Sequence, residues 1–279
     1  MLLFPNAKIN IGLKILRRRA DGYHDLSSVF VPIGWCDILE ITPSESFSFR
    51  QSGNALDCPA SNNIVLKALR ALTDFLGREL PPLEIALEKH IPSGAGLGGG
   101  SADAAFTLTG VNELLELGLD KPTLAKIAAK VGADCPFFIY NTPMLASGIG
   151  DILRPIDVDN LRGKYIVVVK LRTQSVSTAQ AYAGVVPCDS STEADLAKAV
   201  TRPVAGWRYD DALTNDFENS VFGHLPELAA VKSRMYDKGA VYSAMSGSGS
   251  AIFGIFDDAQ SANAAKDAFK GCEVFAERF

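Results

Sequence analysis

Residues 92–102 form a glycine-rich segment whose composition suits the binding of an anion. Five glycines occur within seven of its residues, and it reads Pro92, Ser93, Gly94, Ala95, Gly96, Leu97, Gly98, Gly99, Gly100, Ser101 and Ala102. Glycine adds no side chain to a core, but it allows positive φ, close approach of another group and freely pointing N–H groups. A helical pattern follows directly, and a helix N-terminus adds unpaired N–H groups and partial positive charge. The segment therefore predicts a phosphate-binding loop.

This segment is not a Walker A loop. That loop ends in Gly-Lys-Ser/Thr, whose lysine reaches the terminal phosphates, whereas Ser101 follows Gly100 here. A phosphoryl-transfer enzyme without this lysine still needs a cation and a group that orients or deprotonates the acceptor hydroxyl. Lys8 and Asp134 are the best candidates. The residues alone leave two alternatives open, a solvated lysine at a sheet edge and a carboxylate that caps a helix.

A dinucleotide-binding fingerprint also fits poorly. Its pattern can be laid over Gly94, Gly96 and Gly99, but it requires an acidic residue some twenty residues further on, after the next strand. The candidates, Glu113 and Glu116, fall within a predicted helix. We therefore reject this interpretation.

The elements around Lys8 are predicted to be strands. Apolar residues alternate with polar ones over residues 7–15, which indicates a strand with one buried face. Lys8, Asn10 and Gly12 share its other face. Residues 26–33 read as a returning strand, so a hairpin is expected. Further strands are predicted at residues 35–41 and 83–87.

The elements around Asp134 are predicted to be helices. Apolar spacing and capping residues place helices after Asn63, from Ser101 to Gly118, after Asp120 and after Asp134. Pro136 stands in the first turn of the last of these helices, which is typical of an N-cap at Asp134. Gly148, Gly150 and Pro155 then punctuate the chain, and we place a domain boundary there.

The second half of the chain mixes strands and helices without strict alternation. The expected elements are a strand at 165–169 covered on both faces, helices at 177–183, 193–200, 226–238 and 259–269, and strands at 251–256 and 273–276. A second glycine turn runs from Ser246 to Gly249. No elements are assigned to residues 43–61, and residues 187–210 include loops that cannot be ordered. The expected fold class is α+β, with domains 1–155 and 156–279.

Composition limits the possible partners and location. The 279 residues carry a net charge of -5, which argues against a broad surface for nucleic acid or acidic membranes. The one basic run, Arg17 to Arg19, reads as a solvated turn, with a local anionic ligand as the alternative. No segment resembles a signal core or a membrane span. Widely spaced thiols indicate a reduced, soluble cytoplasmic protein; they are Cys36, Cys58, Cys135, Cys188 and Cys272.

The glycine-rich segment resembles the phosphate loop of the GHMP kinases, Pro-x-x-x-Gly-Leu-Gly-Ser/Gly-Ser/Gly-x-Ala. Three further segments, at residues 5–11, 19–24 and 132–138, resemble those of the 4-diphosphocytidyl-2-C-methyl-D-erythritol kinases within this superfamily. The similarity resumes at residues 215–218 and 246–253 and is thin between residues 172 and 212. The resemblance implies a two-domain GHMP kinase fold, with a mixed-sheet N-terminal domain carrying helices and a smaller α+β C-terminal domain.

The resemblance also implies roles for single residues. Asp134 would be the general base and Lys8 would stabilise its charge and the developing alkoxide, while Asn10 would position the erythritol part. Residues 92–102 would wrap the phosphates of ATP, with Ser101 as a hydroxyl donor or magnesium contact. Asn63 matches a position near the adenine. ATP and Mg2+ are the implied cofactors, and no metal ligand is assigned.

The cytidine end of the substrate is expected at three further residues. Tyr23 offers a flat ring, and His24 offers hydrogen bonds to a cytosine edge, which is how unpaired bases are commonly recognised. Tyr182 matches an aromatic residue on the opposite side of the base, with a core or surface residue as the alternative. The turn from Ser246 to Gly249 resembles one near the reacting centre, with an ordinary tight turn as the alternative.

The expected reaction is transfer of the γ-phosphoryl group of ATP to the 2-hydroxyl of 4-diphosphocytidyl-2-C-methyl-D-erythritol, a step of the non-mevalonate isoprenoid pathway. Two rivals are a kinase for homoserine or mevalonate, and a GHMP-fold sensor that has lost catalysis. The Arg-Ala-Asp-Gly-Tyr-His segment argues against the first. Retention of Lys8 and Asp134 argues against the second.

Overall fold

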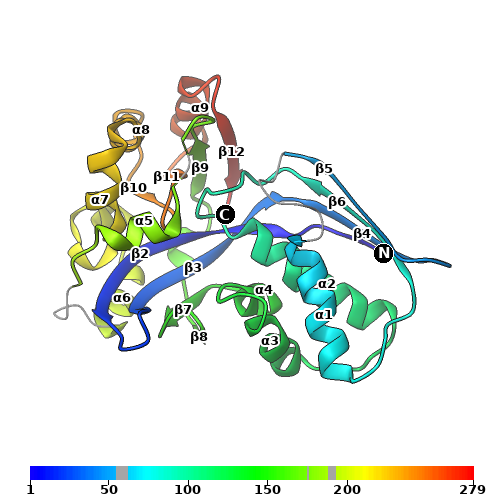
Figure 1. Cartoon of the computed structure of the whole chain (residues 1–279). Helices are drawn as coiled ribbons and strands as arrows, with labels where there is room; N and C mark the ends of the chain where they lie inside the picture. The colour runs from blue at the N-terminus through cyan, green and yellow to red at the C-terminus, as the bar shows by residue number, and fades with distance from the viewer. Residues whose placement is uncertain (55–61, 175, 188–192) are drawn as a thin grey trace. The chain divides into compact units, whose positions relative to one another are not determined.

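The chain folds into two compact units, and each unit is built from segments that alternate along the sequence. The computed structural model describes residues 1–54, 62–174, 176–187 and 193–279 (Figure 1). Unit 1 comprises residues 1–7, 34–93 and 98–142, and unit 2 comprises residues 8–33, 94–97 and 143–279. The glycine-rich segment therefore contributes residues 94–97 to unit 2 and its two ends to unit 1.

Unit 1 combines a mixed sheet with helices. Its sheet has the order β1-β4-β6-β5, in which β5 runs parallel to β6 and the other pairs are antiparallel. The strands are β1 (Leu2–Leu3), β4 (Ile38–Pro43), β5 (Ser48–Gly53) and β6 (Leu83–Lys89). The helices, visible beside this sheet in Figure 1, are α1 (Ile64–Leu76), α2 (Gly99–Leu114), α3 (Lys121–Ala129) and α4 (Cys135–Tyr140). Helix α2 packs on β4 and contacts the other three helices.

Local sequence signals explain several of these elements. The Asn63 side chain accepts a hydrogen bond from the Val65 amide and caps α1, and Gly77 ends the helix with φ 63°. Asp120 caps α3 in the same way. In β6 the apolar residues Leu83 and Ile85 are buried at alternate positions. These predictions are confirmed.

Helix α2 differs from its prediction at both ends. It begins at Gly99, because Gly98 takes the left-handed conformation with φ 72° immediately before it. It ends at Leu114 rather than near Gly118, and Glu116 lies outside the helix with φ 50°. The Asn112 side chain bonds both the amide and the carbonyl of Leu119, at 2.9 and 3.1 Å, and so turns the chain away from the helix axis.

A second sheet has the order β2-β3-β7-β8. Its strands are β2 (Asn6–Arg18), β3 (His24–Cys36), β7 (Met144–Ser147) and β8 (Ile152–Pro155). The expectation that β2 buries only one face is wrong, since every residue from Ala7 to Leu13 is buried. The separate strands predicted at 26–33 and 35–41 also need correction. β3 continues to Cys36 as one long strand beside β2, and β4 starts only at Ile38.

The glycines at the predicted domain boundary lie in a hairpin turn. Ser147 at the end of β7 pairs with Ile152 at the start of β8, and Gly148 and Gly150 between them have positive φ. The two compact units do not follow a single cut of the chain. The boundary after residue 155 stays a prediction about sequence domains.

Unit 2 also contains an antiparallel sheet covered by helices. Its order is β10-β11-β9-β12, and its strands are β9 (Tyr165–Lys170), β10 (Tyr242–Met245), β11 (Ile252–Phe256) and β12 (Glu273–Arg278). The helices of this unit are α5 (Thr178–Ala183), α6 (Glu193–Val200), α7 (Phe217–His224), α8 (Pro226–Asp237) and α9 (Ala259–Ala268). Short 3-10 segments are η2 (Asp159–Leu161), η3 (Val204–Tyr209) and η4 (Asp211–Leu213).

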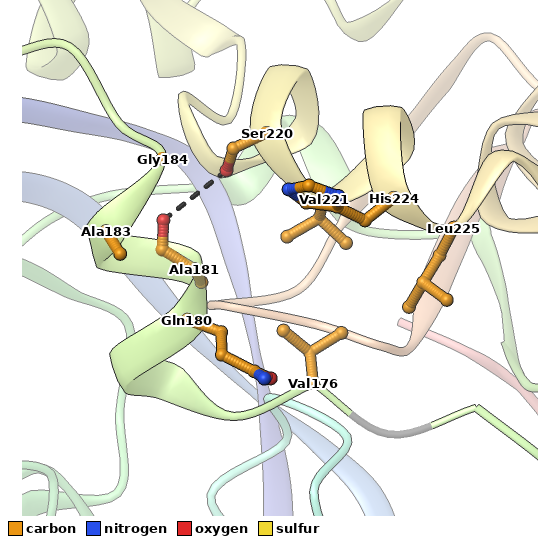
Figure 2. Close-up of a pocket in the computed structure, with 9 residues that line it drawn as sticks. All are labelled: Val176, Gln180, Ala181, Ala183, Gly184, Ser220, Val221, His224 and Leu225. Carbon is orange, nitrogen blue, oxygen red and sulfur yellow. Dashed lines mark hydrogen bonds between the residues drawn. The ribbon is translucent and has the colours of Figure 1, made fainter.

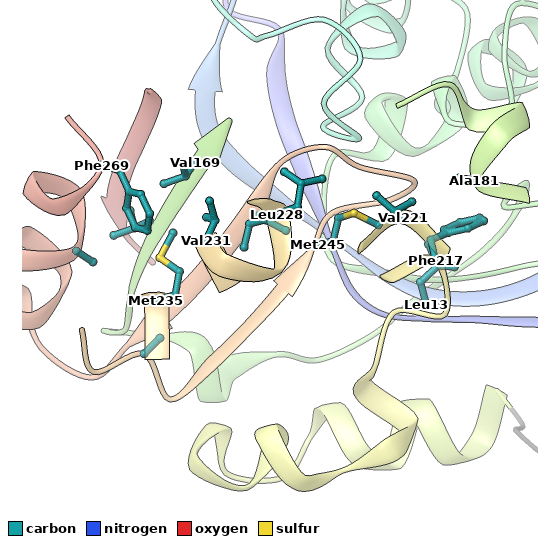
Figure 3. Packing of buried hydrophobic residues seen from close by; sticks show 14 of the residues in the cluster. Leu13, Val169, Ala181, Phe217, Val221, Leu228, Val231, Met235, Met245 and Phe269 are labelled. Atoms are coloured by element: carbon teal, nitrogen blue, oxygen red, sulfur yellow. The ribbon is translucent and has the colours of Figure 1, made fainter. Parts of the chain in front are cut away.

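One apolar cluster connects the strands and helices of unit 2. Figure 3 shows Met235 and Val231 of α8 and Phe269 after α9 packed near Val169 of β9, and Phe217 and Val221 of α7 further along the same core. Burial of such side chains is the main favourable term in folding. The strand at 165–169 and the helices at 177–183, 193–200, 226–238 and 259–269 are confirmed within one or two residues. The α+β class is also confirmed, because the strands form antiparallel and mixed sheets rather than one doubly wound parallel sheet.

No helix in the described parts of the chain combines the length and apolar character that a membrane span requires. Cys135 and Cys272 are free thiols, and Cys36 Sγ donates a hydrogen bond to Gly34 O at 3.1 Å. Cys58 and Cys188 lie outside the described residues. Burial raises the pKa of the Cys135 thiol to about 12. A neutral thiol is a poor nucleophile.

Candidate functional site

The carbonyl groups of residues 94–97 all accept hydrogen bonds from within unit 2. The donors are the Ser250 amide to Gly94 O (3.2 Å), the Ala251 amide to Ala95 O (3.0 Å), Ser246 Oγ to Gly96 O (2.8 Å) and the Lys8 amide to Leu97 O (2.9 Å). The carbonyl edge of the segment is therefore fixed against the second glycine turn and the start of β2.

The backbone amides of residues 94–97 have no such partners among the residues that the structure describes. Within the described parts of the chain, no backbone amide of residues 94–101 donates a hydrogen bond. Gly94, Gly96 and Gly98 all have positive φ, at 61°, 73° and 72°. Alternation of left-handed and other residues directs successive N–H groups to one side and makes an anion-binding concavity. The segment therefore has unbonded amide donors, and its binding of a phosphate stays a prediction.

Gly96 cannot carry a side chain at this position. A Cβ there would lie 2.0 Å from the carbonyl oxygen of Ser246, and its φ of 73° already disfavours other residues. The turn that approaches it is held by Asn215, whose Nδ2 donates to Met245 O at 2.7 Å and to Gly247 O at 2.8 Å. The second glycine turn is therefore part of the structure that shapes the first.

Asn215 acts through contacts that its sequence position does not reveal. Its Oδ1 accepts a hydrogen bond from the Phe217 amide at 2.9 Å, and the side chain is buried. An asparagine two residues before a helix is a recognisable signal for such a local bond. Its bonds to residues 245 and 247 join segments distant in sequence, and no spacing rule predicts them.

Lys8 lies in a buried polar network of unit 2. Its Nζ donates to Asn10 Oδ1 at 2.5 Å and lies 4.6 Å from the centroid of the Phe30 ring. Asn10 Nδ2 donates to Ser28 Oγ at 2.8 Å, and Ser28 Oγ donates to Gly12 O at 2.7 Å. Lys8 is only 3% exposed, so the alternative of a solvated edge lysine is wrong. The ammonium group is oriented by an amide that is itself fixed.

Asp134 is half-buried at the start of α4 in unit 1. It occupies the N-cap position, and Pro136 stands in the first turn, as predicted. However, its side chain does not cap the helix. The alternative interpretation of this carboxylate as a helix cap is therefore wrong. Its pairing with Lys8, which belongs to unit 2, stays a prediction.

Asn63 and Ser101 belong to unit 1. Both polar atoms of the Asn63 side chain are hydrogen-bonded. Its Oδ1 caps α1, and its Nδ2 donates to Gln51 Oε1 at 2.7 Å. Ser101 lies in the first turn of α2. These positions explain both residues structurally, and their contacts to ATP stay predictions.

The predicted cytidine-binding residues are only partly brought together. The rings of His24 and Tyr182 stack with centroids 4.9 Å apart and an interplanar angle of 21°, and Tyr182 meets Phe217 edge to face at 4.8 Å. Tyr182 thus packs on the core of unit 2 and also presents a ring to His24. Tyr23 is 62% exposed, in the turn before β3.

The basic run beside Tyr23 is an exposed turn with ion pairs. Arg17 Nε contacts Asp25 Oδ2 at 2.5 Å, and Arg19 contacts both Asp21 and Asp25. The hydrogen bond from Arg17 is the main cause of a lowered pKa of Asp25. The interpretation of this run as a solvated turn is supported by these contacts.

A pocket of about 440 Å³ lies between α5 and α7 of unit 2 (Figure 2). Gln180 and Val176 face His224 and Leu225 across it, and Ser220 Oγ donates to Ala181 O at 3.4 Å on one side. None of the residues that line it is a predicted site residue.

Both halves of the chain match family models. The model described as the GHMP kinases N terminal domain matches residues 63–142, and the GHMP kinases C terminal model matches residues 206–273. A crystal structure of a mevalonate kinase from Methanococcus jannaschii has a TM-score of 0.74 at 14% identity over all of this chain and 98% of that one. This last likeness shows the fold alone.

Closer relatives carry one name. A protein of Parabacteroides distasonis, named 4-diphosphocytidyl-2-C-methyl-D-erythritol kinase, is 47% identical over 257 residues, which cover 92% of each chain. A crystal structure of a 4-(cytidine 5'-diphospho)-2C-methyl-D-erythritol kinase has a TM-score of 0.81 at 31% identity, over 99% of this chain and 98% of that one. The expected two-domain GHMP kinase fold is confirmed, and the chain is a kinase that belongs to the 4-diphosphocytidyl-2-C-methyl-D-erythritol kinase family of the GHMP superfamily.

Proposed function

We propose that this kinase transfers the γ-phosphoryl group of ATP to the 2-hydroxyl of 4-diphosphocytidyl-2-C-methyl-D-erythritol and so acts in the non-mevalonate isoprenoid pathway. The observation that carries the proposal is the set of unbonded amides at residues 94–101 in a chain of this family. The residues assigned to the proposed reaction below are those to which the sequence resemblance gives roles.

ATP binds through its phosphates to the glycine-rich segment, residues 92–102. The free amides of residues 94–101 donate to phosphate oxygens, and the N-terminus of α2 adds its partial positive charge. Because the carbonyl groups of residues 94–97 are already bonded, the segment need not rearrange to expose these amides. Such preorganisation places most of the catalytic effect in positioning and charge stabilisation. Asn63 lies near the adenine.

The transfer step uses Asp134 and Lys8. The carboxylate of Asp134 takes the proton of the 2-hydroxyl, the hydroxyl oxygen forms the new bond to the γ-phosphorus, and the bond from that phosphorus to the bridging oxygen breaks. ADP leaves with the electron pair of the broken bond. The Lys8 ammonium, held by Asn10, stabilises the negative charge that develops on the acceptor oxygen.

The cytidine end binds at Tyr23, His24 and Tyr182. The stacked pair of His24 and Tyr182 offers a flat surface with hydrogen-bonding nitrogens at its edge, and exposed Tyr23 supplies a further ring. Asn10 positions the erythritol part. A cytosine base has both a flat face and a polar edge, which these side chains match.

Mg2+ accompanies ATP in this proposal. No group of three or more His, Cys, Asp or Glu side chains that could hold a metal ion by itself occurs within residues 1–54, 62–174, 176–187 and 193–279. Mg2+ is commonly bound by one or two protein oxygens together with substrate phosphates, so Ser101 fits as a single hydroxyl contact. The ion would neutralise phosphate charge, and no step above is assigned to it. A cytoplasmic location, without nucleic-acid or membrane partners, completes the proposal.

Steady-state kinetics test this function. Purified protein with ATP, Mg2+ and the cytidylated substrate should release ADP and form one phosphomonoester per ADP. Homoserine and mevalonate serve as competing acceptors. Faster turnover with either of them would replace the proposed substrate, and ADP release that does not depend on any acceptor would remove the transfer step.

A further inference from the structure

A buried group of three ionisable side chains lies at the two ends of the glycine-rich segment, wholly within unit 1. Lys89, the last residue of β6, contacts Asp37 and Asp103 of α2, the latter at 2.6 Å. The three side chains are at most 2% exposed. We call this group the Asp37–Lys89–Asp103 triad. None of its members has a role in the proposed reaction.

The triad fixes the strand that enters the segment. Asp37 Oδ1 accepts hydrogen bonds from the amides of His90 at 2.6 Å and Ile91 at 2.8 Å, which are the residues just before the segment. Asp37 Oδ2 bonds Lys89 Nζ. One carboxylate thus holds both the end of β6 and the lysine on it.

The triad also fixes the helix that leaves the segment. Asp103 stands one turn after Gly99, the first residue of α2, and its Oδ2 accepts from Lys89 Nζ. Ile91 supports the same junction, since a Cβ at Gly99 would lie 2.9 Å from its Cγ2. A single ammonium group therefore connects the start of the segment to its end.

This arrangement costs free energy and so needs a reason beyond stability. Two carboxyl groups and one ammonium are removed from water, and buried polar groups of this kind commonly stabilise a fold less than apolar residues of similar volume. Asp103 Oδ1 is buried without a hydrogen-bond partner among the described residues. Burial is the main cause that raises the pKa of Asp103 to about 8, so at neutral pH Asp103 keeps its proton and accepts a hydrogen bond from Lys89, whose ion pair is with Asp37. Such a group suits a requirement for defined geometry of the segment better than a requirement for stability of the fold.

We propose that the Asp37–Lys89–Asp103 triad positions the phosphate loop, by holding the end of β6 and the first turns of α2 at the spacing that the loop needs to present its amides to ATP. These are positioning residues, because they act through residues 92–102 and touch no substrate. The ligand class assumed here, a nucleoside triphosphate, rests on the proposed function. The positioning itself can be measured without any ligand.

Amide hydrogen exchange on the ligand-free protein provides that measurement. Asp103→Ala breaks the link to α2 but leaves Lys89 paired with Asp37, so the chain should still fold. The flanking amides of Ile91 and Ala102, which are hydrogen-bonded, should exchange at least tenfold faster relative to the Leu115 amide at the far end of α2. Asp103→Asn keeps an acceptor for Lys89 and should stay within about threefold of wild type.

Leu108→Ala is the matched control, because it removes a fully buried side chain from the same helix without touching the triad. Leu108→Ala should lower the melting temperature. It should accelerate hydrogen exchange of the Ile91, Ala102 and Leu115 amides by the same factor. The decisive quantity is the exchange rate of the Ile91 and Ala102 amides divided by that of the Leu115 amide. If this ratio were the same in Asp103→Ala and Leu108→Ala, the proposal would be overturned.

Calorimetric titration with a non-hydrolysable ATP analogue then links positioning to the ligand. Asp103→Ala should bind the analogue at least fivefold more weakly than wild type, whereas Asp103→Asn and Leu108→Ala stay within about threefold. Unchanged affinity in Asp103→Ala would overturn the role in presenting amides. A wild-type protein that binds no analogue would instead contradict the proposed function, and the exchange ratios would still decide whether the triad positions the segment.

Discussion

Replacing Gly96 by alanine should damage ATP use far more than the size of one methyl group suggests. The new Cβ would lie 2.0 Å from Ser246 O and 2.8 Å from its carbonyl carbon, so the segment and the second glycine turn must separate. The φ of 73° adds about 1–2 kcal/mol for a non-glycine residue. Separation also loses the bond from Ser246 Oγ to Gly96 O, worth about 0.5–1.5 kcal/mol.

These two terms together amount to about 1.5–3.5 kcal/mol, or roughly 10- to 300-fold in ATP affinity if the loop has to be restored before ATP binds. The assay is titration with a non-hydrolysable ATP analogue, alongside kcat/KM for ATP and the melting temperature. Gly118→Ala is the matched control, since Gly118 has a φ of 69° and a Cβ added there would meet no atom within 4 Å. It should cost stability only. Normal ATP affinity in Gly96→Ala would refute the inferred close approach.

Three other changes test separate parts of the structure. Asn215→Ala removes the side-chain donor that bonds the carbonyl groups of residues 245 and 247. It should lower kcat/KM for ATP about 10- to 100-fold. A variant that loses only melting temperature would show that Asn215 has a purely structural role. His24→Ala or Tyr182→Leu should raise KM for the cytidylated substrate at least tenfold with little change for ATP, and equal losses for both would show that the base binds elsewhere. Because the folded-state pKa of Asp103 is raised from 3.8 to about 8, the stability that its bound proton contributes should be complete below pH 3.8 and lost as pH rises to about 8. Denaturant unfolding between pH 5 and 9 should show that decline in wild type and lose it in Asp103→Asn; the same slope in both would contradict the assignment.

Local patterns predicted much of the fold correctly. The N-cap at Asn63 and the alternation in β6 are decided by neighbouring residues, so a single sequence suffices to find them. The composition of residues 92–102 likewise predicted free amides, because only glycine readily adopts the positive φ values seen there.

What the sequence could not show depends on contacts between distant segments. The polar face of β2 is buried, and there Asn10 bonds Ser28 on another strand, so an expected solvent face is an internal network. Lys89 and Asp103 are ordinary charged residues in sequence, and only folding brings their side chains together. Asp134 looked like a helix cap because capping is a common role of an aspartate at that position, yet its side chain makes no capping bond.

The most direct test compares wild type with Asp134→Asn in the presence of ATP, Mg2+ and 4-diphosphocytidyl-2-C-methyl-D-erythritol. Wild type should release ADP in step with the 2-phosphate product, and the variant should bind the ATP analogue normally while its kcat falls by about 10²- to 10⁴-fold, because a general base typically contributes that much. Absence of ADP above background in wild type, or full turnover in Asp134→Asn, would contradict the proposed reaction or the proposed base.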